Sequence, residues 1–263
     1  MASKRIALVT GASSGLGSAF AEHLAMQGYD LILTSRGATA METLAARIKS
    51  SANVDVIVEP ADLSEPGGCT ALTDALDRRG ISPSVVINNA GFGLNERFAD
   101  HDADRLASML ELNIGSLTKL THFYGRRMMA ADGGHILLVA SLAAHMPAPL
   151  MAAYAASKAY VLSLGEALHV EFAPKVGVCV LSPGYMETGF DAVSGFEPTA
   201  ATRRTALATT EVARLGLDSL FAGKSAVVAG RANKAAATIL KLLPRAFIAR
   251  QAAKASGMRY REQ

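Results

Sequence analysis

The sequence has little of what stabilises a protein without a large packed core. Its 263 residues include no tryptophan, only two cysteines and 6% aromatic side chains. Cys69 and Cys179 lie far apart and match no metal-ligand spacing. We therefore expect free thiols, no metal site and a reducing compartment, which points to the cytoplasm.

A long apolar run is also missing. The run that follows Lys4-Arg5 stops at Thr10-Gly11, which is too short for a signal-peptide core, and no other uninterrupted run approaches the length of a membrane span. We therefore expect a soluble protein with no transmembrane segment.

Acidic residues are scarce toward the end of the chain. Residues 200–263 hold twelve Lys/Arg and three Asp/Glu, whereas residues 1–199 hold fourteen and twenty. Aromatic residues do not interleave with the basic ones of this tail, so its charge does not indicate nucleic-acid binding. A solvated or anion-facing surface fits the composition better.

The chain does have the apolar content for one α/β domain over residues 1–263, since 50% of its side chains are hydrophobic. Short apolar runs alternate with helical patterns, which predicts a doubly wound parallel sheet with helices on both faces. The predicted strands are 5–10, 30–35, 54–60, 84–88, 135–140, 176–182 and 225–229. The predicted helices are 16–28, 41–49, 72–79, 102–129, 152–172 and 210–221.

Two later segments follow no simple pattern. Residues 189–205 carry Gly, Pro and Ser without a clean period, which predicts a mobile loop with short helical pieces. Residues 233–255 form a basic helical segment that Pro244 kinks or splits. We expect this segment to pack on the domain or on a second subunit, with peripheral membrane contact and disorder as the alternatives.

A tyrosine and a lysine stand four residues apart in one predicted helix, at Tyr154 and Lys158. Residues at this spacing share a helix face. A nearby ammonium favours the phenolate, so Lys158 is expected to lower the pKa of Tyr154 and let it exchange a proton with an alkoxide near neutral pH. The spacing alone also fits a surface tyrosine beside a solvated lysine.

A glycine-rich turn follows the first predicted strand, with the spacing Gly11-x-x-x-Gly15-x-Gly17. Such a turn lets the backbone approach a pyrophosphate, and the next helix supplies free N–H groups at its N-terminus. A tight turn with no ligand remains the alternative.

The residue after the second strand of such a fold reads the adenosine ribose. A carboxylate there accepts from a 2′-hydroxyl, whereas an arginine accommodates a 2′-phosphate. This chain has Arg36 and no acid at that place. NADP(H) is therefore favoured over NAD(H), unless Arg36 is only a solvated surface residue.

Several separated motifs, in this order and spacing, resemble the short-chain dehydrogenase/reductase family over roughly residues 4 to 190. They are the glycine-rich turn, Asn88-Asn89-Ala90-Gly91, Asn113, Ser141 thirteen residues before Tyr154, and Pro183-Gly184-Tyr185-Met186-Glu187-Thr188. The resemblance implies a Rossmann fold of about seven strands and a substrate lid around 189–205. It also implies a homo-oligomer, dimer or tetramer, formed through helices 102–129 and 152–172.

The resemblance implies site residues as well. The catalytic residues would be Asn113, Ser141, Tyr154 and Lys158. The cofactor-binding residues would be Gly11, Ser13, Ser14, Gly15, Leu16, Gly17, Arg36, Asp62, Leu63, Asn89, Ala90, Gly91, Tyr154, Lys158, Pro183, Gly184, Met186 and Thr188. Asp62 could instead cap a helix.

The expected activity is an NADP(H)-dependent transfer of hydride between the nicotinamide and a carbonyl or secondary alcohol. Two alternatives stay open: a dehydratase or epimerase on the same fold, and a dinucleotide-binding regulatory protein. The residues expected to line the substrate pocket are mostly apolar, which favours an apolar small-molecule substrate. They are Phe92, Leu94, Leu142, His145, Met146, Met151, Tyr185 and Phe190.

Overall fold

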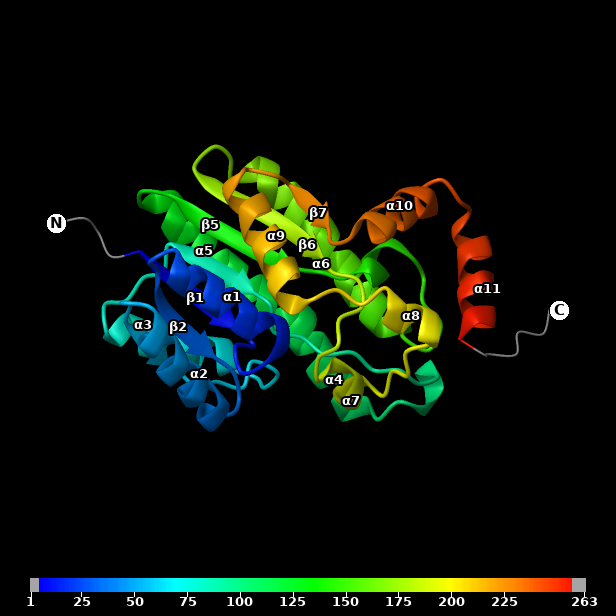
Figure 1. The fold of residues 1–263 in the computed structure, drawn as a ribbon, viewed down its shortest axis with the longest axis horizontal. Coiled ribbons are helices and arrows are strands. Elements are labelled where there is room, and N and C mark those ends of the chain that lie inside the picture. Colours follow the sequence, from blue (N-terminus) through cyan, green and yellow to red (C-terminus); the bar gives the residue numbers. More distant parts are fainter. Residues whose placement is uncertain (1–4, 257–263) are drawn as a thin grey trace.

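A computed structural model describes residues 5–256 of the chain (Figure 1). Its centre is a seven-stranded sheet in the order β3-β2-β1-β4-β5-β6-β7, in which every neighbouring pair is parallel. The predicted doubly wound sheet is confirmed. The strands are β1 (Ile6–Thr10), β2 (Asp30–Thr34), β3 (Val56–Val58), β4 (Val85–Asn88), β5 (Gly134–Val139), β6 (Val176–Ser182) and β7 (Ala226–Val228). The ends of the predicted domain, 1–4 and 257–263, lie outside the described residues.

Helices cover both faces of this sheet because its strands are apolar on both sides. In β1, Ala7 and Val9 pack under one set of helices, and Leu8 packs under the other. The first set is α1 (Gly15–Met26), α2 (Ala38–Ser51) and α9 (Thr209–Phe221). The second set is α3 (Gly68–Arg78), α5 (Leu117–Ala130) and α6 (Ala152–Glu171).

The strand order reverses between β1 and β4, which are neighbours in the sheet. From β1 the chain continues to β2 and β3 on one side, and from β4 it continues to β5, β6 and β7 on the other. In open α/β sheets a crevice opens at this switch point, outside the carboxyl ends of the strands. The glycine-rich turn after β1 and the Asn-Asn-Ala-Gly segment after β4 both lie at that edge. The topology therefore brings two of the predicted motifs together.

The long helix predicted over 102–129 is helical from 103 to 130, but it is not α-helical throughout. It consists of α4 (Ala103–Leu110), a π-helical turn at Glu111–Ser116, and α5. Hydrophobic period alone does not distinguish such a widened turn from an α-helix. The turn contains Asn113, which is fully buried.

The last third of the chain is less regular, as expected. Residues 189–205, the segment expected to form a substrate lid and called the lid segment below, contain the short helices α7 (Phe190–Ser194) and α8 (Ala200–Arg204). Pro244 splits the basic C-terminal segment into α10 (Arg231–Leu240) and α11 (Arg245–Ala255). Within residues 5–256, no helix combines the length and the apolar character needed to cross a membrane.

Candidate active site

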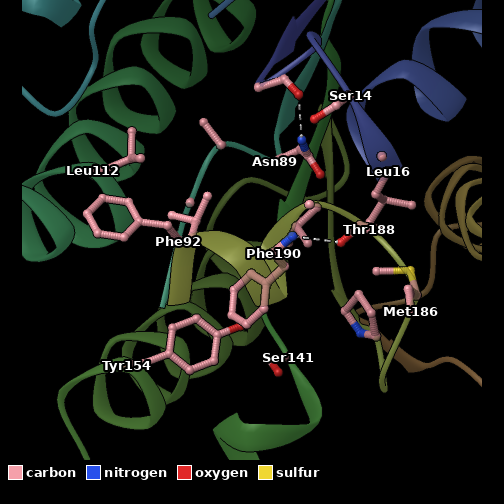
Figure 2. A pocket seen from close by; sticks show the side chains of 18 of the residues that line it. Ser14, Leu16, Asn89, Phe92, Leu112, Ser141, Tyr154, Met186, Thr188 and Phe190 are labelled. Atoms are coloured by element: carbon pink, nitrogen blue, oxygen red, sulfur yellow. Dashed lines mark hydrogen bonds between the residues drawn. The ribbon is translucent and has the colours of Figure 1, made fainter. Parts of the chain in front are cut away.

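A cavity of about 700 Å³ opens at the carboxyl edge of the sheet and gathers most of the predicted site residues. Figure 2 shows Ser14 and Asn89 toward one part of it and Tyr154 and Ser141 toward another. The predicted residues that line the cavity are Gly11, Ser13, Ser14, Gly15, Leu16, Arg36, Asp62, Leu63, Asn89, Ala90, Gly91, Ser141, Tyr154, Lys158, Pro183, Gly184, Met186 and Thr188. Gly17 and Asn113 lie behind this wall.

The turn between β1 and α1 can exist only with glycine at its key positions. Gly11 and Gly15 have φ angles of 66° and 57°, in the left-handed region. A Cβ on Gly17 would overlap the carbonyl oxygen of Gly11. These residues therefore fix a close passage of backbone that larger side chains would block.

The same turn leaves a helix end open toward the cavity. Ser14 is the N-cap of α1, yet its side chain makes no capping hydrogen bond, and the first turn of the helix has no acidic residue. The free N–H groups and the positive end of the helix dipole form a site for an anion such as a pyrophosphate. The cradle fits a dinucleotide in both shape and charge.

Asn89 stabilises the neighbouring strand end. Its Nδ2 donates to the Thr10 carbonyl oxygen at 2.9 Å, and its own N–H donates to Thr10 Oγ1 at 3.0 Å. The N–H of Ala90 also donates to Thr10 Oγ1, at 2.9 Å. These bonds join β1 to the segment after β4, so Asn89 both shapes the cavity wall and holds the sheet edge.

Arg36 lies two residues after the end of β2, on the cavity wall. It is exposed, and within residues 5–256 it forms no ion pair. Asp62, farther along the wall, accepts from the N–H of Ser64 at 2.9 Å. The idea that Asp62 caps a helix is wrong, because α3 begins only at Gly68 and its N-cap is Gly67.

Tyr154 and Lys158 do face the same buried space. Lys158 Nζ lies 5.9 Å from the centroid of the Tyr154 ring and donates to the Val139 carbonyl oxygen at 2.9 Å. Burial lowers the pKa of Lys158 to about 8. The ammonium form, although disfavoured, remains the major one at neutral pH.

The expectation that Lys158 lowers the pKa of Tyr154 is not met. Burial raises the pKa of Tyr154, and only a hydrogen bond with Ser141 lowers it in part. Lys158 is not among the causes of that shift, and its ammonium donates to the Val139 carbonyl oxygen. The structure therefore keeps the Tyr154 phenol protonated, with Ser141 as its hydrogen-bonding neighbour.

Asn113 connects the elements around this pair. Its Nδ2 donates to the Phe92 carbonyl oxygen and to Ser157 Oγ, both at 3.0 Å, while its Oδ1 accepts from the Phe92 N–H at 3.2 Å. A Cβ on Gly91 would lie 2.8 Å from this Oδ1 and 3.2 Å from Lys158 Nζ. The side chain of Asn113 thus holds the cavity wall through Phe92 and Ser157.

Apolar side chains line the cavity beyond Tyr154. The ring centroids of Tyr154 and Phe190 lie 5.5 Å apart, and Figure 2 shows the two rings next to each other. Of the expected pocket residues, Phe92, Leu142, Met151, Tyr185 and Phe190 do line the cavity. Leu94, His145 and Met146 are absent from its wall.

The structure gives reasons for two of those differences, at Leu94 and His145, and adds residues that the sequence did not indicate. Leu94 is buried against Met109 and Tyr154, and the His145 ring lies 3.3 Å from Ser182 Oγ. The additional wall residues are Ser35, Gly37, Ala40, Ala61, Ser64, Leu112, Val139, Ala140, Ala143, Gly189, Val193, Phe196 and Thr202. Ser35 adjoins Arg36 and could have been inferred from it, whereas Val193, Phe196 and Thr202 depend on how the lid folds.

Residues 5–195 match the family model described as short chain dehydrogenase. The chain belongs to the short-chain dehydrogenase/reductase family. It therefore has the Rossmann-type architecture of a family of oxidoreductases, and the sequence resemblance is confirmed.

Known members of the family show how far this likeness extends. The 11-beta-hydroxysteroid dehydrogenase A of Arachis hypogaea is 32% identical over 185 residues, which are 70% of this chain and 53% of that protein. This chain thus spans about half the length of that curated relative. A short-chain dehydrogenase from Sphingobium yanoikuyae, solved in complex with NADPH, is 26% identical with a TM-score of 0.82 and covers 98% of both chains. A family member from Burkholderia phymatum, solved in complex with NAD, is 25% identical with a TM-score of 0.79 over 98% of this chain and 97% of that one.

Proposed function

We propose that this protein is an NADP(H)-dependent oxidoreductase that transfers hydride between the nicotinamide and an apolar carbonyl or secondary alcohol. The observation that carries the proposal is one cavity that combines a glycine-built anion cradle with Ser141, Tyr154 and Lys158. A nicotinamide dinucleotide held there would supply the hydride for reduction or accept it in oxidation. The remaining chemistry belongs to the side chains of this chain.

Tyr154 would act as the general acid in reduction. Its pKa is raised by burial, so it holds its proton until a developing alkoxide accepts it. Ser141, whose hydroxyl acts on the pKa of Tyr154, would donate to the same substrate oxygen. In oxidation the two residues work in reverse, and Tyr154 receives the proton.

Lys158 and Asn113 would support these two residues. Lys158 has one hydrogen bond, to Val139, and its other N–H donors can hold the hydroxyls of a ribose. Asn113 holds Phe92 and Ser157 in place, and it would anchor a water that passes protons inward. The buried position of both residues keeps the reacting groups in place.

The choice of NADP(H) over NAD(H) depends on Arg36. Its guanidinium is without an ion-pair partner among residues 5–256, and it stands after β2 beside Ser35, where a 2′-phosphate would need a cation. The two matched structures contain NADPH and NAD respectively, so both nucleotides occur in similar proteins. Arg36 supports NADP(H) for this chain.

The walls around Tyr154 support a bulky apolar substrate. Phe92, Leu112, Met151, Phe190 and Val193 carry no charge, and no Asp, Glu, Arg or Lys other than Lys158 lines this part of the cavity among the described residues. The relative from Arachis hypogaea is named for a hydroxysteroid, which is consistent with such a pocket. A ketone of steroid or long acyl character would bury most apolar surface there.

Turnover with a panel of carbonyl compounds tests the proposal. Purified protein should consume NADPH, followed by its absorbance, with at least one bulky apolar ketone or aldehyde and more slowly with small sugars. The reverse reaction should reduce NADP⁺ with the matching secondary alcohol. If the protein binds NADPH but shows no turnover across ketones, aldehydes and alcohols, a binding or regulatory role replaces the proposal.

A further inference from the structure

The junction between α10 and α11 exposes apolar side chains that the described part of the chain does not cover. Leu242 is 82% exposed, Ile239 56% and Phe247 49%. All residues from 241 to 247 are exposed. We refer to residues 239–247 as the C-terminal face.

This face lies on a part of the chain that is loosely attached to the body. In α11 only Ile248 and Ala253 are buried, and in α10 only Ala237 is. Figure 1 shows α11 at one end of the molecule, beyond α10 and away from the central sheet. Within residues 5–256, Leu242 stays mostly uncovered and Phe247 about half uncovered, which leaves apolar surface open for binding in the described part of the chain.

The charge carried by residues 231–255 is of one sign. Residues 231–255 contain no Asp or Glu, and their basic residues are Arg231, Lys234, Lys241, Arg245, Arg250 and Lys254. Exposed Leu, Ile and Phe beside Lys and Arg is the pattern of helices that lie in a membrane interface. Each basic side chain near an anionic lipid surface adds about 1 kcal/mol of attraction.

A second copy of this chain fits the face less well. Subunits of symmetric dimers meet through the same patch on both copies. Here such a contact would oppose two sets of Lys and Arg with no acid from either segment to compensate. The charge therefore favours an anionic occupant over another C-terminal face.

We propose that the C-terminal face docks this protein on the surface of anionic lipid bilayers, with Ile239, Leu242 and Phe247 inserted among the lipids and the flanking Lys and Arg paired with headgroups. The contact is peripheral and reversible, because the apolar area is small. It is independent of the proposed reaction, since none of these residues lines the cavity.

Co-sedimentation of the full-length protein with vesicles tests this. The protein should bind vesicles of phosphatidylcholine with phosphatidylglycerol at least about tenfold more tightly than vesicles of phosphatidylcholine alone, and added salt should weaken the binding. The double variant Leu242→Gln/Phe247→Gln should lose about tenfold or more in vesicle affinity, because burying such a side chain is worth at least a factor of ten. Lys241→Glu/Arg245→Glu should lose at least as much.

Matched variants on other surfaces control for charge and for exposed apolar area. Met26→Gln removes a side chain that is 69% exposed on α1. Lys49→Glu/Arg78→Glu changes the net charge by the same amount as the basic pair, at exposed positions of α2 and α3. These controls should bind vesicles like the wild type, and all variants should keep NADPH binding.

Three results would overturn the proposal. The first is a wild-type protein that stays in the supernatant with anionic vesicles. The second is vesicle binding that the control variants weaken as much as the variants of the face. The third is light scattering that shows the Leu242/Phe247 variant dissociating an oligomer, which would make a second copy the occupant.

Discussion

The cavity end near α1 is walled by the backbone of the glycine-rich turn, whereas the cavity end near α7 is walled by side chains of residues 189–205. At the first end, Gly11, Gly15 and Gly17 permit a path that no larger residue could follow. At the second end, Phe190 and its neighbours define the volume by their size. The backbone path at the first end therefore requires glycine, whereas the shape of the second end depends on which side chains the lid segment carries.

This difference explains why relatives bind similar nucleotides yet carry different substrate names. A backbone cradle is specified by a few glycines, so distant sequences share it. A wall of apolar side chains has no such constraint, because many combinations fill the same space. Membership of the family thus indicates the cofactor end more closely than the substrate end.

Tyr154→Phe should remove the proton transfer without affecting binding at either end of the cavity. It removes the hydroxyl and keeps the ring that contacts Phe190, so we expect NADPH binding and folding to persist while kcat falls about 10²- to 10⁴-fold. Steady-state kinetics and nucleotide titration measure the two effects. A variant with more than about a tenth of wild-type kcat would exclude Tyr154 as the acid.

The buried Lys158 ammonium should make the stability of the folded chain depend on pH. Its pKa is about 8 in the folded chain and 10.5 ordinarily. Between these values the unfolded state binds the proton and the folded state does not, so the free energy of unfolding should rise with pH, by at most about 1.4 kcal/mol per unit. Below pH 8 and above pH 10.5, Lys158 adds no slope.

Urea unfolding followed by circular dichroism measures this dependence, and Lys158→Met is the control. Other groups, including Tyr154 with its raised pKa, act equally in both proteins, so the difference between them isolates Lys158. The rise should be absent from the variant. An equal pH dependence in both proteins would mean that burial does not affect the Lys158 ammonium.

Gly17→Ala should damage the glycine end. The added methyl group would overlap the Gly11 carbonyl, and overpacking of this kind costs about 1–3 kcal/mol. We expect a lower Tm and weaker NADPH binding. Gly189→Ala is the matched control, because a Cβ there meets nothing within 4 Å. Equal behaviour of the two variants would show that the turn tolerates a side chain.

Phe190→Ala should affect only the lid end. Loss of its ring would widen the pocket beside Tyr154 and reduce kcat/KM for a bulky apolar substrate about tenfold. The Kd for NADPH should stay within about twofold of the wild type, since Phe190 belongs to the apolar wall. An equal loss of nucleotide affinity would mean that the two ends are not separable.

The sequence predicted the first end better than the second for the same physical reason. Alternating apolar runs and glycine spacing are local signals, and they located the sheet and the turn after β1. The π-turn at Asn113 was missed because a hydrophobic period does not distinguish it from an α-helical turn, and the bonds of Asn113 to Phe92 and Ser157 join residues distant in sequence. Phe196 lines the cavity because of how the lid segment folds, and this segment has no hydrophobic period from which its fold could be predicted.

The raised pKa of Tyr154 was missed for a related reason. Helical spacing correctly placed Lys158 on the same face as Tyr154, but it does not show where the ammonium points or how deeply the phenol lies. The Val139 carbonyl, on β5, takes the Lys158 bond, and burial then dominates the pKa of Tyr154. Such effects require the packed structure.

The central claim is that the glycine end is a ready-made site for NADP(H), with Arg36 reading its 2′-phosphate. Calorimetric titration of NADPH and NADH into the wild type and Arg36→Asp tests it directly, and it needs no substrate. The charge-assisted contact is worth about 1.5–3 kcal/mol, so the wild type should prefer NADPH by about 10- to 150-fold. Arg36→Asp should reverse that preference, because a carboxylate repels the phosphate and accepts from the 2′-hydroxyl of NADH. Equal affinity of the wild type for both nucleotides, or an unchanged ratio in the variant, would contradict the claim.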